Sequence, residues 1–186
     1  MSEHADIAHT TDKRIALLIA VLALFLALVE TGAKSAQTDV ITRNVEAANL
    51  WAFFQAKTIR QTTVRTAVEQ IELQRAAAEP AVRTALDAQQ KAWRDTAARW
   101  ESEPSTGEGR KELAARAKES EAHRDLSLAK YHFYEYAAAL FQVAIVIASA
   151  SIVTGVGLLA GLGVLLGLGG LGLGGIGIFA PLAFHF

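Results

Sequence analysis

The C-terminal stretch of the chain, residues 137–186, places the strongest constraint on the fold because it contains no Asp, Glu, Lys or Arg. Its only ionisable side chain is His185. As one helix rising ~1.5 Å per residue, this stretch would be roughly twice as long as the ~30 Å hydrocarbon core of a bilayer. We therefore expect it to cross a membrane twice, and we expect the charged remainder of the chain to be held at that membrane.

Charge and composition exclude several classes of function. The chain has 18 Lys and Arg against 19 Asp and Glu, and no stretch concentrates basic residues enough to neutralise phosphates, so we expect no nucleic-acid partner. The absence of Cys excludes thiolate metal sites and thiol nucleophiles. The five His show no spacing typical of a metal site. We predict no catalytic residue, no metal, no cofactor and no enzymatic activity.

A shorter apolar run over residues 15–29 follows Lys13 and Arg14. Extended to residue 33, it is long enough for a short transmembrane helix, although ~20 residues is the usual length. The alternative is a cleaved signal peptide, with a basic start, an apolar middle and small residues at 31–33. We expect an uncleaved span over 15–33, because a second membrane block makes an anchor the simpler account, and a flexible polar tail over 1–14.

The middle of the chain, residues 34–136, is predicted to form a charged helical hairpin outside the membrane. Residues 33–78 lack Pro and are rich in Ala, Gln, Glu and Arg, which favours one long outgoing helix. Pro80 marks a break and the start of a second helix, and residues 102–109 form a loop. A third helix from Arg110 continues into the second span, over 137–154. The alternative is a compact three-helix bundle.

Apolar residues in this hairpin recur at the 3–4 spacing of a coiled coil. One such run is Ile41, Val45 and Ala48, and another is Val64, Val68, Ile71 and Ala78. Aromatic residues are expected in the core of the domain, with lipid or ligand contact as the alternative for the dense cluster at residues 50–54. The expected core residues are Trp51, Phe54, Trp93 and Trp100.

Two features are expected at the membrane interface. Tyr131, Tyr134 and Tyr136 lie where the last charged residues stop, and amphipathic rings collect at the headgroup level. Glu30 ends the first span. We expect its carboxylate to extend to the interface, with a role in gating or proton coupling as the alternative.

Residues 155–186 combine a turn with a third span, and eleven glycines lie between residues 155 and 177. GxxxG pairs let helix backbones approach closely, so we expect glycine-mediated packing and self-association, with the turn near 155–163 and the span over 164–184. The GxGxxG match at 167–172 follows no strand, which excludes dinucleotide binding. The six predicted packing glycines are Gly157, Gly161, Gly163, Gly167, Gly170 and Gly174.

The chain resembles a family of small bacterial membrane proteins known only as a domain of unknown function. The strings that carry the resemblance are KRIALLIAVLALFLALVE from residue 13, LWAFFQAKTIRQT from 50, TGEGRKEL from 106 and YHFYEYAAALFQVAIV from 131. The resemblance covers about residues 13–155. It implies a multi-pass protein of the bacterial inner membrane, and it implies no reaction, substrate or catalytic residue.

The predicted fold is therefore an all-α membrane protein with about three transmembrane helices and a helical hairpin between the first two. Basic residues that precede the second span favour a cytoplasmic hairpin domain, although the rule weakens for regions longer than ~60 residues. The favoured function is a homo-oligomeric scaffold that presents a coiled-coil domain to a protein partner at the bilayer. The alternative is an oligomeric channel or transport protein with glycine-rich pore helices.

Overall fold

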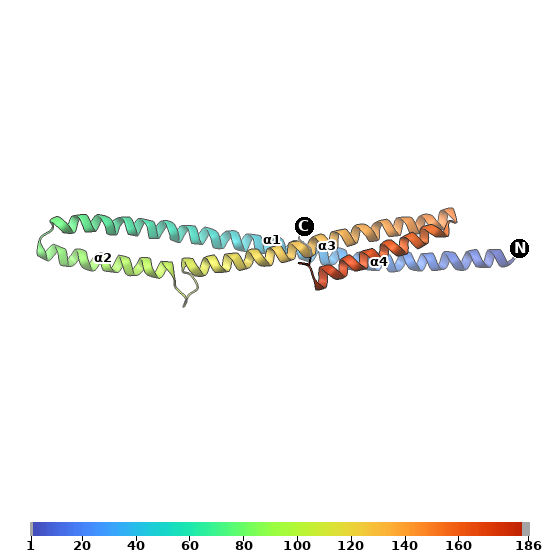
Figure 1. The fold of residues 1–186 in the computed structure, drawn as a ribbon, viewed down its shortest axis with the longest axis horizontal. Helices are drawn as coiled ribbons and strands as arrows, with labels where there is room; N and C mark the ends of the chain where they lie inside the picture. The colour runs from blue at the N-terminus through green and yellow to red at the C-terminus, as the bar shows by residue number, and fades with distance from the viewer. Residues whose placement is uncertain (1, 184–186) are drawn as a thin grey trace. The chain divides into compact units, whose positions relative to one another are not determined.

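The computed structural model describes the backbone of residues 2–183 and the side chains of residues 13–183. Its elements are α1 (Ser2–Ala77), α2 (Pro80–Glu101), α3 (Arg110–Thr154) and α4 (Gly157–Phe179), and residues 2–183 contain no strand (Figure 1). The all-α prediction is confirmed. Residues expected to form a flexible N-terminal tail instead belong to α1 from Ser2 onward.

Three of the four helices, α1, α3 and α4, are long and apolar enough to cross a membrane. This agrees with the three spans predicted. Helix α4 starts at Gly157 and not near Val164, because the turn after α3 needs only two residues. Gly155 adopts a left-handed φ of 72°, which glycine reaches without steric cost, and Val156 accepts a 2.9 Å hydrogen bond at its carbonyl from the Ser151 hydroxyl.

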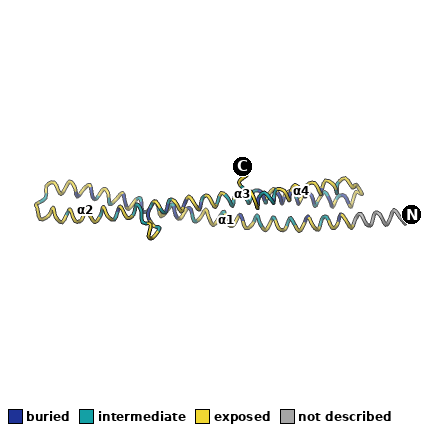
Figure 2. The backbone as a smooth tube through the Cα atoms, turned by 60° about the horizontal axis from the view of Figure 1, so that its bottom comes forward, coloured by how far each residue is buried: buried dark blue, intermediate teal, exposed yellow. Residues whose placement is uncertain are grey.

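The chain divides into two units, residues 1–41 with 124–186 and residues 42–123. The first unit is a bundle of three helical segments, from α1, α3 and α4. Its core centres on Leu22, Ala137, Phe141 and Ala144, and Phe25 of α1 stacks on Phe141 with 6.1 Å between ring centroids. Buried residues lie where these segments face one another (Figure 2).

The second unit packs residues 42–77 of α1 against α2 and the first part of α3. Leu50, Leu113 and Ala117 form a buried cluster near the start of this α1 segment, while Val68 near its end accepts a hydrogen bond from Gln90 of α2. Contacts therefore run antiparallel along the segment.

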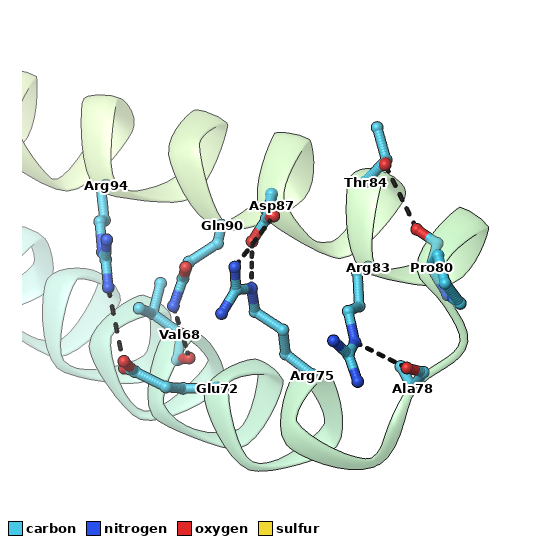
Figure 3. A network of polar contacts seen from close by, with 10 residues as sticks. All are labelled: Val68, Glu72, Arg75, Ala78, Pro80, Arg83, Thr84, Asp87, Gln90 and Arg94. Carbon is cyan, nitrogen blue, oxygen red and sulfur yellow. Dashed lines mark hydrogen bonds and ion pairs between the residues drawn. The ribbon is translucent and has the colours of Figure 1, made fainter.

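The two connections of this unit follow local chemistry. Pro80 occupies the first turn of α2, where its missing N–H is not needed, and the Arg83 guanidinium donates a 2.7 Å hydrogen bond to the carbonyl of Ala78 (Figure 3). In the loop before α3, Gly107 has a φ of 68°. The Glu112 carboxylate closes that loop by accepting hydrogen bonds from the Ser102 hydroxyl at 2.6 Å and the Glu103 amide at 3.2 Å.

The two apolar runs predicted to have coiled-coil spacing lie on opposite faces of α1. Val68 and Ile71 are buried, whereas Ile41 and Val45 are 60% and 53% exposed. The physical reason is phase: from Ala48 to Val64 the helix advances sixteen positions, and at 3.6 residues per turn this leaves a rotation of ~160°. The spacing within each run therefore does not determine which face of the helix is buried.

Candidate functional site

A partly buried polar cluster of the second unit joins all three of its helical segments. Gln61 of α1 is buried, and its amide nitrogen donates to the Ala97 carbonyl at 3.0 Å and to the Glu101 carboxylate at 3.1 Å. Its amide oxygen accepts a 2.6 Å hydrogen bond from Arg110 at the start of α3. The same Arg110 nitrogen lies 2.8 Å from Glu101. We call these three residues, Gln61, Glu101 and Arg110, the polar pin.

Electrostatics in the polar pin favour the ionised carboxylate. The hydrogen bond from Gln61, followed by the charges of Arg110 and Lys111, lowers the pKa of Glu101. The Arg110 guanidinium also lies 4.9 Å from the centroid of the Phe54 ring, a cation–π distance. Its Nε is buried without a hydrogen-bond partner among the described residues. These groups satisfy one another almost completely, which suits a structural role at the α2–α3 connection.

Lys57 is a buried charged residue in this unit. Its side chain is 7% exposed, with the ammonium 5.1 Å from the centroid of Phe53 and 3.9 Å from the Glu108 carboxylate. An ammonium held between a ring face and a loop carboxylate ties α1 to the loop of residues 102–109. Among the described residues, no group of three His, Asp or Glu is placed to hold a metal ion.

The four aromatic residues predicted for the core of this domain are all half-buried. Trp51 packs edge-on against Phe54 at 5.4 Å and donates a 2.9 Å hydrogen bond to Glu121 of α3. Trp93 and Trp100 lie on α2 and are not among the fully buried residues. Leu50, Gln61 and Leu113 are buried more deeply.

In the first unit, five glycines of α4 form a buried line, which we call the glycine seam. Its members are Gly163, Gly167, Gly170, Gly174 and Gly177. They recur at steps of four and three residues, the spacing of one helix face. A Cβ on Gly167 would lie 2.5 Å from Leu22 of α1, and a Cβ on Gly170 would lie 3.0 Å from Phe141 of α3. The seam thus lets both neighbouring segments of the same chain approach the α4 backbone.

The six glycines predicted for packing divide into two groups. Four of them belong to the seam, whereas Gly157 and Gly161 are exposed, and a Cβ on either would meet nothing within 4 Å. Gly177 is buried against Phe133 and Tyr134 and was missed, although its three-residue step from Gly174 could have revealed it. A search for GxxxG detects only four-residue steps.

Two of the four residues predicted at the membrane interface, Glu30 and Tyr131, line a groove of about 460 Å³ in the first unit. Glu30 of α1 accepts a 3.2 Å hydrogen bond from the Gln142 amide of α3, so its carboxylate has a partner within the bundle. Tyr131, whose hydroxyl donates to Glu135, also lines this groove. Tyr134 packs between Gly32 and Gly177, and Tyr136 is exposed.

Comparison with known proteins gives one family. Neither a curated protein nor a solved structure matches the chain. Residues 11–180 match the family described as Domain of unknown function (DUF4337). The match extends beyond residue 155, where the resemblance noted from the sequence was expected to end, and includes the whole of α4. The chain therefore belongs to this family of unknown function.

Proposed function

We propose that this protein is a membrane-anchored, homo-oligomeric scaffold. In this proposal the first unit is a three-span anchor and the second unit is a helical hairpin outside the bilayer. Copies of the hairpin associate along an exposed face of α1 and present the assembly to a protein partner. We propose no catalytic activity, no cofactor and no nucleic-acid partner.

The distribution of charge supports this division. Residues 137–183 and 15–29 contain no Asp, Glu, Lys or Arg, as hydrocarbon requires. The second unit instead carries exposed ion pairs, such as Arg75 with Asp87 and Lys91 with Asp95. A charged side chain at the centre of a bilayer costs about 2.5–3.5 kcal/mol on insertion scales, so such pairs belong in water.

The observation that carries the proposal is a strict heptad on the exposed face of α1. Five residues of α1 that are spaced seven apart are all exposed, and we call them the exposed stripe. They are Val45, Ala52, Ile59, Thr66 and Leu73. Ile59 and Leu73 are 67% and 77% exposed although both are large and apolar. The opposite face of the same helix is already packed within the hairpin.

A second copy of the chain fits this stripe better than an unrelated helix does. A seven-residue repeat is the spacing that two supercoiled helices share. Copies inserted in one membrane with the same topology present the stripe in parallel. A two-fold axis can then bring each stripe residue against its own equivalent.

Cysteine cross-linking tests the proposal directly because the chain contains no Cys. Ala52→Cys and Ile59→Cys would each place a thiol on the stripe, within disulfide reach of the same thiol in a second copy. Arg60→Cys is the matched control, since Arg60 is exposed on the same helix but lies ~100° away from Ile59. We expect covalent dimers from the first two variants alone, and a multimeric mass by light scattering in mild detergent.

A monomeric mass, or equal cross-linking at Arg60, would refute the association.

We further propose that the protein resides in a bacterial inner membrane with the second unit in the cytoplasm. The basic residues of α3 before its apolar part, such as Arg116, Lys118 and Lys130, support this side through the positive-inside rule. Labelling of the cysteine in Arg60→Cys by an impermeant reagent, in intact and in opened cells, tests the orientation.

A further inference from the structure

A continuous apolar groove follows the boundary between α1 and α4 in the first unit. Three hollows of about 350, 110 and 300 Å³ lie in sequence along it. The first and second share Leu18 and Val164, and the second and third share Phe25, Phe141 and Leu171. We call this the α1/α4 groove. It opens beside Arg14 at one end and reaches Tyr134 at the other.

Missing side chains on α4 create much of the space. Gly157 and Gly161 line the first hollow, and Gly175 lines the third. A Cβ on any of these three glycines would meet nothing within 4 Å, so the room that they leave is not filled by other parts of the chain. Phe141 of α3, which is fully buried, lines both the second and the third hollow.

The first end of the groove is basic. Arg14 lines the first hollow, and Lys13 precedes it. Asp12 precedes Lys13 in the sequence, but residues 13–29 of α1 and 136–183 of α3 and α4, whose side chains the structure describes, contain no carboxylate. A guanidinium binds phosphate through two parallel hydrogen bonds. The chemistry of this end therefore fits the phosphate of a lipid headgroup whose net charge is negative.

The length from this basic end matches one leaflet of a bilayer. Phe25 lies eleven residues after Arg14 on α1, a rise of ~16 Å, and half of the ~30 Å hydrocarbon core is ~15 Å. An acyl chain whose headgroup is at Arg14 would therefore end near Phe25 and Phe141. We propose that the α1/α4 groove binds an anionic phospholipid, with the phosphate on Arg14 and one acyl chain along the first two hollows.

Selectivity should come from the headgroup. Lipid tails are as apolar as the groove, so a chain that leaves the bilayer for the groove gains packing contacts and little hydrophobic free energy. A basic residue near the surface attracts anionic lipid strongly enough to change binding by about fivefold. We thus expect Arg14→Gln to weaken phosphatidylglycerol binding about fivefold and to reduce the preference over phosphatidylcholine.

The test is native mass spectrometry of the full chain in detergent, titrated with phosphatidylglycerol and, separately, with phosphatidylcholine. Gly161→Leu would place a side chain in the first hollow, where a Cβ meets nothing within 4 Å, and should abolish the bound phosphatidylglycerol. Gly172→Leu is the matched control, because a Cβ there also meets nothing within 4 Å and Gly172 does not line the groove. It should bind lipid like the unmodified protein.

Three results would overturn the proposal. The first is unchanged phosphatidylglycerol binding in Gly161→Leu. The second is competition by glycerol phosphate as effective as that by the intact lipid, which would leave the groove without a role. The third is a Gly161→Leu variant that keeps its lipid but loses oligomeric mass, which would show that a second copy covers the groove. Failure of the cross-links at Ala52 and Ile59 would leave this lipid test unaffected.

Discussion

Replacement of Gly163 by Leu should separate α4 from α3, whereas the same replacement at Gly172 should not. A Cβ on Gly163 would lie 3.1 Å from the carbonyl oxygen of Ala144 and 3.2 Å from the Cβ of Ala148. Neither neighbour can rotate away, because one is backbone and the other is the single side-chain carbon of an alanine. A Cβ on Gly172 would meet nothing within 4 Å.

The magnitude follows from this difference. Overpacking costs about 1–3 kcal/mol. We expect Gly163→Leu to destabilise the packing of α4 by about 2–3 kcal/mol, because the rest of the leucine must follow its Cβ into occupied space. Loss of a helical glycine changes helix propensity by ~1 kcal/mol at either position, so comparison of the two variants cancels that effect. The population with α4 detached should therefore be about 30- to 150-fold higher in Gly163→Leu.

Thiol labelling measures this population. Ser151 of α3 is 2% exposed, and Ser151→Cys would supply the only thiol in the chain. When the helices reclose faster than the reagent reacts, the labelling rate follows the open population. In this background, labelling in mild detergent should be about 30- to 150-fold faster for Gly163→Leu than for Gly172→Leu. Equal rates would refute the claim that the glycine seam holds α4 in place.

Three further predictions concern the second unit, whose three Trp residues report its unfolding by fluorescence. Gln61→Ala should lower the free energy of unfolding by about 1–3 kcal/mol, because it leaves buried polar groups without partners, while Gln55→Ala on the exposed side should change it by less than about 0.5 kcal/mol. The pKa of Glu101 is lowered from 4.5 in the folded protein, so its carboxylate stabilises the fold above pH 4.5. This contribution is lost as the pH falls further. Glu101→Gln should therefore remove that part of the acid sensitivity in unfolding curves measured between pH 3 and 7. Gly107→Ala should cost about 1 kcal/mol in thermal unfolding because of the left-handed φ of 68°, and no loss would contradict that backbone conformation.

Helix boundaries in the middle of the chain were predictable because single residues set them. Pro80 starts α2 and Arg110 starts α3 directly after a loop with Pro104, Gly107 and Gly109, as the sequence indicated. Proline and glycine act through their own backbone geometry, so no tertiary information is needed. The start of α4 was placed too late. The glycines favoured a turn over residues 155–163, but the turn ends before Gly157.

The face that each apolar run presents was not predictable in the same way. The runs that begin at Ile41 and at Val64 both have heptad spacing, and spacing alone does not state which run packs against α2 and α3. The polar pin was missed for a related reason. Gln61, Glu101 and Arg110 are common surface residue types, and they become buried partners only when three helical segments meet at one level.

Four of the six glycines predicted for packing lie on the buried face of α4, and this placement changes where self-association should be sought. The seam from Gly163 to Gly177 is occupied by side chains of the same chain, including Leu22 and Phe141. An oligomer that keeps this packing must associate through other surfaces. Seam substitutions should therefore destabilise the bundle of one protomer, whereas substitutions on the exposed stripe of α1, such as Ile59→Glu, should change the mass of the assembly and leave thiol labelling at position 151 unchanged. Measurement of both quantities on both kinds of variant distinguishes a monomeric anchor that unfolds from a scaffold that dissociates.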